Sequence, residues 1–133
     1  FAGTGALGIE ALSRGAAWVD FVERDPKQCA VIKENLSSTG FSDKARVLRM
    51  SVNSALESLN GPYELILMDP PYELESLNQV LDGLERSALP GDRAVLVVGH
   101  SKRQTLEGSY GGFIRTGSHR YGDSQVALFS RGN

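Results

Sequence analysis

The chain has 133 residues, of which 41% are hydrophobic and 23% are charged, as expected for a single globular domain over residues 1–133. A net charge of −2 and an isoelectric point near 5.7 exclude binding to nucleic acid through overall positive charge, so RNA or DNA must be held by a local patch or by residues outside the chain. The single cysteine, Cys29, cannot form an internal disulfide, which favours the cytoplasm, and no apolar run is long enough to span a membrane.

The chain opens on a glycine-rich stretch, residues 1–8, that runs directly into a segment with helical spacing, residues 9–15. Gly3, Gly5 and Gly8 have the spacing of the dinucleotide-binding fingerprint, in which glycines let a ligand approach the backbone at the start of a helix. A helix that needs these glycines only to pack against a sheet explains the same pattern.

A strand is predicted next, over residues 17–23, and it ends in an acid, Glu23. Glu23 lies about 20 residues beyond Gly3, the separation at which an acid binds ribose hydroxyls in dinucleotide-binding folds. The pairing of a glycine loop with an acid at a strand end is more specific than either feature alone. A helix follows, with Asp25 as its N-cap and Gly40 just beyond its end.

The rest of the chain alternates between predicted strands and helices. We expect strands over 45–50, 63–67 and 94–98, a short helix capped by Asn53, and a helix over 77–84. The run 94–98 is nearly all apolar, which is typical of a strand covered on both faces. This alternation predicts a parallel sheet in an α/β fold.

The C-terminal part differs because no helix separates its strands. Residues 113–116 and 125–129 are predicted strands joined by the polar stretch 118–123, so they should pair antiparallel. This end is also locally basic, with Lys102, Arg103, Arg115, His119 and Arg120, a pattern that solvated surface charges explain as well. The two histidines, His100 and His119, have no Cys or His at metal-ligand spacing, so we expect no metal.

The most informative stretch is Asp69-Pro70-Pro71-Tyr72, which follows the strand over 63–67. The prolines lack an N–H and have a fixed φ, so they make a stiff corner whose oxygen atoms only accept hydrogen bonds. Acceptors beside the flat ring of Tyr72 suit a planar group that carries an NH2, such as a nucleobase. A simple turn that ends the strand explains the prolines equally well.

Together these motifs resemble the RsmD-type ribosomal RNA methyltransferases. The stretches that carry the resemblance are residues 1–16, 21–23, 69–72 and 121–122, so it covers nearly the whole chain. It implies a Rossmann-like fold that uses S-adenosylmethionine, with a mostly parallel sheet and an antiparallel C-terminal hairpin. It also implies methylation of the exocyclic amine of one guanine in small-subunit ribosomal RNA, either as naked RNA or in an assembling subunit.

The resemblance assigns roles to individual residues. The residues that it implies for cofactor binding are Ala2, Gly3 and Gly5 for the methionine part, Glu23 for the ribose, Ser51 and Val52 for the adenine, and also Asp69. Those that it implies for the target base are Asp69, Pro70 and Tyr72. The chain departs from the family at Gly99, where many members carry an acid.

Members of this family have an additional strand that leads into Phe1 and an N-terminal extension that helps to grip RNA. The resemblance therefore implies that the natural protein is longer, and that this chain lacks the first strand. For the chain alone we expect weak cofactor binding, low activity, or a sheet edge filled by another chain.

Four alternatives stay open on the sequence. A DNA adenine methyltransferase shares the Asp-Pro-Pro-Tyr motif but usually has a target-recognition domain, and a glutamine methyltransferase usually has Asn in place of Asp69. A nicotinamide dehydrogenase shares the glycine spacing but gives no reason for Asp-Pro-Pro-Tyr. An inactive module that only binds S-adenosylmethionine or RNA would keep the same fold.

Overall fold

The computed structural model describes residues 1–70, 77–101, 106–121 and 124–132. It divides into two compact units, Phe1–Ala55 (unit 1) and Leu56–Asn133 (unit 2), which are described in turn. The assignment of residues 1–133 to one methyltransferase domain stays a prediction. Among the residues in these ranges, no helix is both long and apolar enough to cross a membrane.

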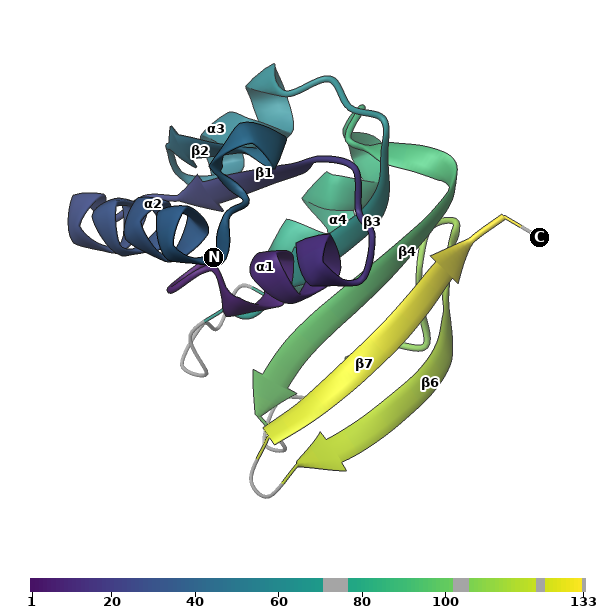
Figure 1. The fold of residues 1–133 in the computed structure, drawn as a ribbon. Coiled ribbons are helices and arrows are strands. Elements are labelled where there is room, and N and C mark those ends of the chain that lie inside the picture. The colour runs from purple at the N-terminus through teal and green to yellow at the C-terminus, as the bar shows by residue number, and fades with distance from the viewer. Residues whose placement is uncertain (71–76, 102–105, 122–123, 133) are drawn as a thin grey trace. The chain divides into compact units, whose positions relative to one another are not determined.

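Unit 1 contains a two-stranded parallel sheet with helices packed on it. Its elements are α1 (Ala6–Ser13), β1 (Val19–Glu23), α2 (Pro26–Thr39), the short 3-10 helix Ser42–Lys44, β2 (Ala45–Arg49) and the start of α3 (Val52–Ser58). β1 and β2 pair in parallel from Val19 opposite Ala45 to Glu23 opposite Arg49. Figure 1 shows both strands and the long helix α2 beside them.

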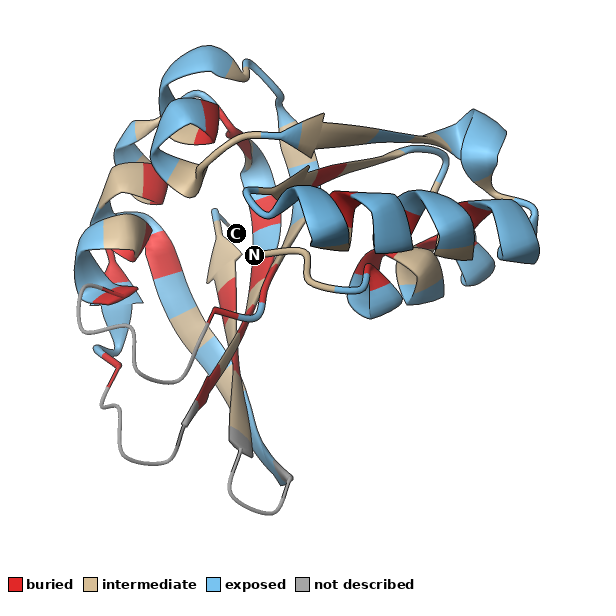
Figure 2. Cartoon of the chain, turned by 90° about the vertical axis from the view of Figure 1, so that its left-hand side faces the viewer, coloured by how far each residue is buried: buried red, intermediate tan, exposed pale blue. Residues whose placement is uncertain are grey.

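Apolar side chains from both helices and from β1 form the core of unit 1. Leu12, Phe21, Ile32 and Leu36 are buried together, and Cys29 is also buried. On α2 the buried residues are Cys29, Ile32 and Leu36, and Figure 2 shows buried and exposed positions alternating along the helices. The 3.6-residue period of α2 thus places its apolar side chains against the sheet.

The ends of α2 are those expected from the sequence. The Asp25 carboxylate accepts a hydrogen bond from the Lys27 N–H at 2.9 Å, and Gly40 takes the left-handed conformation with φ of 80°. At α3 the prediction is wrong, because the Ser51 hydroxyl and not Asn53 caps this helix, accepting from the Ser54 N–H at 3.1 Å. Asn53 lies inside the helix, one residue after its start.

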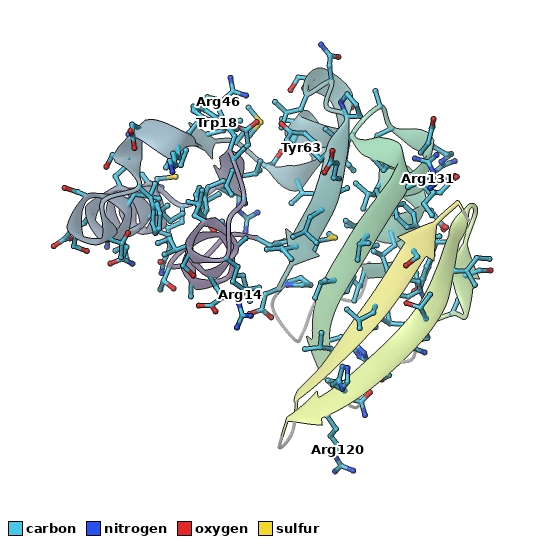
Figure 3. The ribbon with its side chains drawn as sticks, turned by 45° about the vertical axis from the view of Figure 1, so that its right-hand side comes forward. Arg14, Trp18, Arg46, Tyr63, Arg120 and Arg131 are labelled. Atoms are coloured by element: carbon cyan, nitrogen blue, oxygen red, sulfur yellow. The ribbon has the colours of Figure 1, made fainter. Side chains whose placement is uncertain are left out.

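Near the start of β1 a polar cluster ties the two strands together. The Arg46 guanidinium donates to both Asp20 carboxylate oxygens, at 3.1 Å and 3.0 Å, and the Trp18 indole donates to one of them at 2.8 Å. Figure 3 shows Trp18 and Arg46 side by side. The cluster supports the register of β1 against β2. The hydrogen bond to Asp20 also fixes the indole of Trp18, the only tryptophan of the chain.

Gly8 is required by packing, and its replacement tests the core of unit 1. A Cβ at residue 8 would lie 2.3 Å from Cε1 of Phe21, a buried ring that cannot move freely. We expect Gly8→Ala to lower the free energy of unfolding by about 1–3 kcal/mol, measured by urea titration of Trp18 fluorescence. Gly83→Ala in unit 2 is the matched control, since its Cβ would meet only Leu56 Cδ1, at 3.2 Å. Equal urea midpoints for Gly8→Ala and the unmodified chain would contradict this packing.

Unit 2 is a five-stranded sheet with one helix packed on it. Its elements are β3 (Tyr63–Met68), α4 (Leu77–Arg86), β4 (Pro90–Ser101), β5 (Ser109–Tyr110), β6 (Phe113–Tyr121) and β7 (Ser124–Arg131). The strand order is β3-β4-β7-β6-β5, and only the β3–β4 pairing is parallel. Figure 1 shows β4, β7 and β6 running alongside one another. The predicted antiparallel C-terminal hairpin is confirmed as β6 and β7, and β7 also pairs with β4.

Four features of unit 2 differ from the prediction. β4 begins at Pro90 and not at residue 94, β6 continues through residues predicted as a loop as far as Tyr121, and the short β5 was not expected. β4 is also fully buried on one face only, where Ala94, Leu96 and Val98 lie, while Val95 on the other face is 37% exposed. Among the described residues, β1 pairs only with β2 and β3 only with β4, so each is an edge strand of its sheet.

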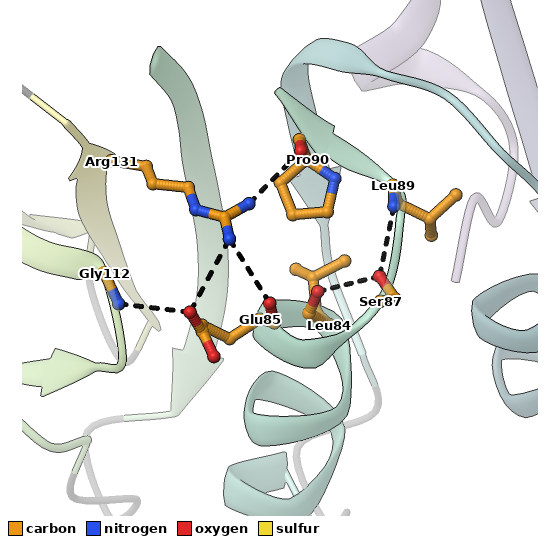
Figure 4. A network of polar contacts seen from close by, with 7 residues as sticks. All are labelled: Leu84, Glu85, Ser87, Leu89, Pro90, Gly112 and Arg131. Atoms are coloured by element: carbon orange, nitrogen blue, oxygen red, sulfur yellow. Dashed lines mark hydrogen bonds and ion pairs between the residues drawn. The ribbon is translucent and has the colours of Figure 1, made fainter. Parts of the chain in front are cut away.

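A polar network joins α4 to the end of the sheet. The Arg131 guanidinium donates to the Pro90 carbonyl at 3.2 Å and to the Glu85 carbonyl at 3.5 Å, and it forms an ion pair with the Glu85 carboxylate at 3.6 Å. That carboxylate also accepts from the Gly112 N–H at 3.3 Å (Figure 4). The network connects the end of α4 with the start of β4, the end of β7 and the β5–β6 turn.

Candidate functional site

The glycine loop of unit 1 is open at Gly3 and closed at Gly5, which is buried against Ile32 and Phe21. Gly3 and Gly5 have φ of 58° and 83°, in the left-handed region that favours glycine, and Gly5 is the N-cap of α1. No side chain caps this helix start, and nothing lies within 4 Å of the point where a Cβ of Gly3 would be. The loop therefore has room for a ligand beside Gly3, and the predicted role of Ala2, Gly3 and Gly5 in cofactor binding stays a prediction.

Glu23 holds this loop against the end of β1. Its Oε1 accepts from the Gly3 N–H at 2.8 Å, and its Oε2 accepts from the Asp25 N–H at 3.0 Å. The Ala2 N–H also donates to the Val22 carbonyl, at 3.2 Å. Each carboxylate oxygen can accept more than one hydrogen bond, so Glu23 keeps acceptor capacity for hydroxyl groups of a ligand.

The ionisation of Glu23 follows from these contacts. Burial raises the pKa of its carboxyl group, but the N–H groups of Asp25, Gly3 and Arg24 and the positive charge of the Phe1 amino group together outweigh burial and hold this pKa below its ordinary value. The group is thus a carboxylate at neutral pH, which is the form that accepts hydrogen bonds from ribose hydroxyls.

The lowered pKa of Glu23 predicts a pH dependence of stability. A carboxyl group whose pKa is lower in the folded chain stabilises it fully above the unfolded pKa, about 4.3, and this contribution is lost as pH falls through the folded pKa. We expect the free energy of unfolding of the unmodified chain to fall more steeply than that of Glu23→Gln as pH falls through the unfolded pKa and below it. Urea titration of Trp18 fluorescence at each pH measures this, and parallel curves would contradict it.

The end of β2 brings Ser51 and Val52 to the same edge of the sheet as Glu23. The Met50 N–H donates to the Glu23 carbonyl at 3.1 Å, and Ser51 follows directly. The Ser51 hydroxyl already caps α3. The groups that remain for a ligand at this point are the backbone of Ser51 and the half-buried side chain of Val52. The predicted residues of unit 1 therefore gather at the carboxyl ends of β1 and β2.

One residue that supports the glycine loop was not found from the sequence. The Asn35 side-chain N–H group, on α2, donates to the Thr4 carbonyl at 2.9 Å, inside the loop. Asn35 is 31 residues from Thr4, and no local pattern marks it, so only the tertiary structure shows this contact.

Unit 2 contains the predicted base-binding residues that the structure describes. Asp69 directly follows β3 and is exposed, whereas Pro70 is buried. Asp69 Oδ1 lies over Gly99 of β4, only 2.6 Å from where a Cβ of Gly99 would be. Tyr72 lies outside the described residues, so its role as a stacking surface stays a prediction. The burial of Pro70 and the exposure of Asp69 present the carboxylate at the end of β3.

The basic residues near the C-terminus do not all face solvent. The Arg115 guanidinium lies over the Phe129 ring, 5.8 Å from its centroid, and so packs on the sheet. Arg120 extends from the end of β6 in Figure 3, and Lys102 and Arg103 lie outside the described residues. Among the residues that the structure describes, no three His, Cys, Asp or Glu side chains are grouped as a metal site requires. The expectation that no metal is bound stays a prediction.

Known proteins resemble the chain in sequence and in fold. The family model described as Conserved hypothetical protein 95 matches residues 1–130. A relative from Bacillus subtilis, "Putative rRNA methyltransferase YlbH", is 31% identical over 98% of this chain and 73% of its own length. "Ribosomal RNA small subunit methyltransferase D" of Escherichia coli is 34% identical over 74% of this chain, and the match spans 49% of its length.

A solved structure shows the same fold. It is described as a putative methyltransferase, yhhF, from Escherichia coli, and it superposes with a TM-score of 0.86 at 28% identity over 99% of this chain and 72% of its own. The Rossmann-like methyltransferase fold expected from the sequence is thereby confirmed. With a family model that covers residues 1–130 and relatives named as ribosomal RNA methyltransferases, the chain belongs to the Conserved hypothetical protein 95 family, that of the RsmD-type methyltransferases.

Proposed function

We propose that this protein transfers a methyl group from S-adenosylmethionine to the exocyclic amine of a guanine in small-subunit ribosomal RNA. The observation that carries the proposal is the Gly3–Glu23 hydrogen bond, which sets an open glycine loop beside an ionised acid at the carboxyl ends of β1 and β2. The names of the relatives support the ribosomal substrate. Such a substrate would place the protein in the cytoplasm, as its single cysteine also predicts.

The residues of unit 1 fit the cofactor. The methionine part would lie against the loop formed by Ala2, Gly3 and Gly5, on the side of Gly3, where the space is open. Glu23 would accept hydrogen bonds from the ribose hydroxyls, and the Ser51–Val52 stretch would lie along the adenine. The bound sulfonium supplies an activated methyl group, so the protein has to position the acceptor amine and needs no covalent intermediate.

The residues of unit 2 fit the amine. A guanine amine shares its lone pair with the ring, which makes it a poor nucleophile. The Asp69 carboxylate and the Pro70 carbonyl would accept its two N–H groups and turn the lone pair toward the methyl group. This is positioning together with electrostatic stabilisation of charge that develops on the nitrogen.

The timing of proton removal follows from the strengths of the groups. An exposed carboxylate is too weak a base to deprotonate a neutral aromatic amine. The proton therefore leaves after methyl transfer has begun, when the nitrogen carries positive charge and Asp69 can accept it. Tyr72 would stack on the base once it has left its helix, a contact worth about 1–3 kcal/mol.

Transfer of a labelled methyl group tests the proposal. The full-length protein is incubated with labelled S-adenosylmethionine and, in parallel, naked small-subunit RNA, partly assembled subunits, duplex DNA and a protein substrate. We expect label in the RNA or the subunits, recovered as N2-methylguanosine after digestion to nucleosides. Label in methyladenine or in protein would overturn the guanine assignment, and binding of NAD in place of S-adenosylmethionine in calorimetry would overturn the methyltransferase itself.

A further inference from the structure

Gly99 lies directly beside the carboxylate that the proposed function uses. Met68 of β3 pairs with Val98 of β4, so Asp69 follows β3 at the level of Gly99. A Cβ at residue 99 would lie 2.6 Å from Asp69 Oδ1 and 3.4 Å from Asp69 Cγ. The first distance is shorter than any contact that a real Cβ makes, so a side chain at position 99 and the present carboxylate position exclude each other.

Backbone conformation does not explain a glycine at this position. Gly99 is absent from the glycines with positive φ, and it pairs with Val126 of β7 as an ordinary strand residue. Gly91, in the same strand, gives a contrast, because a Cβ there would meet Pro62 Cβ and the Tyr63 carbonyl at 3.5 Å, an ordinary contact. The feature specific to Gly99 is the space that it leaves for a carboxylate oxygen.

We infer that Gly99 is a positioning residue, whose missing side chain lets the Asp69 carboxylate lie against the backbone of β4. The inference rests on the proposed function. It adds that Gly99 determines where the acceptor oxygen of Asp69 is held.

The variant Gly99→Ala in the full-length protein tests this inference, with Gly91→Ala as its matched control. The atom that has to move is the end of a flexible side chain, so the variant should fold with an unchanged thermal midpoint. Calorimetry should find the same affinity for S-adenosylmethionine, because the glycine loop and Glu23 are untouched. At saturating substrate we expect kcat to fall by about tenfold to a hundredfold, since a displaced acceptor misplaces the amine. Gly91→Ala should keep the unmodified kcat.

A second comparison separates an effect through Asp69 from a general one. Introducing Gly99→Ala into the Asp69→Ala variant should lower the residual single-turnover rate no further, because the group that it displaces is absent. An equal loss in both backgrounds would overturn the inference, as would an unchanged kcat or a Gly99→Ala protein that fails to fold. If the unmodified full-length protein methylates no RNA, the proposed function is overturned and the inference with it, whereas an active protein with a fully active Gly99→Ala variant overturns the inference alone.

Discussion

Replacing Asp69 with Ala in the full-length protein should reduce the rate of ribosomal RNA methylation by about a hundredfold to a thousandfold. The carboxylate is exposed at the end of β3 and is the acceptor that would orient the amine, so its loss removes an interaction needed in the transition state. The loss should fall on kcat, because most of the predicted cofactor contacts lie in unit 1 and remain. Single-turnover transfer of labelled methyl at saturating cofactor measures the effect.

Two further variants sharpen the Asp69 experiment. Asp69→Asn keeps one acceptor oxygen of similar geometry, so it should retain more activity than Asp69→Ala. Glu64→Ala removes an exposed carboxylate from the same strand and should leave the rate unchanged. If Asp69→Ala methylates at the unmodified rate, the acceptor role of this residue is wrong, although the family assignment would stand.

Replacing Glu23 with Ala should weaken binding of S-adenosylmethionine by about tenfold to a hundredfold, the range expected for losing hydrogen bonds to a charged group. The carboxylate has two roles that are lost together. It would accept hydrogen bonds from the ribose, and it holds the Gly3 N–H at 2.8 Å, which keeps the glycine loop in place. Isothermal titration calorimetry with the purified full-length protein gives the dissociation constant.

The variants around Glu23 distinguish its charge from its shape. Glu23→Gln retains an acceptor oxygen at similar geometry and should weaken binding less than Glu23→Ala. Glu34→Ala, which removes an exposed carboxylate of α2, should bind the cofactor normally and controls for the change in net charge. An unchanged affinity in Glu23→Ala would show that the cofactor does not contact this acid.

Where the sequence prediction was wrong, pairing between distant segments outweighed local pattern. Pro90 and Gly91 are typical of a turn, yet Pro90 begins β4 because it lies opposite Tyr63 at the first position of the strand, where a missing N–H costs little. The polar stretch after residue 117 forms strand because β7 pairs with it as far as Tyr121. Asn53 and Ser51 are both residue types that cap helices. Because β2 ends at Arg49 and α3 begins at Val52, Ser51 is at the cap position and Asn53 lies inside the helix.

The sequence by itself determined the elements and the chemistry that depend on neighbours along the chain. The Asp25 cap, the glycine loop, the acid at the end of β1 and the Asp69-Pro70 corner are all local patterns, because helix periods, caps and proline act over a few residues. Only the tertiary structure decided that Asn35 supports Thr4, that Glu23 binds Gly3, and that the Asp69 carboxylate occupies the space left by Gly99. Those contacts join residues on separate elements, and the packing of helix on strand and of strand on strand determines them.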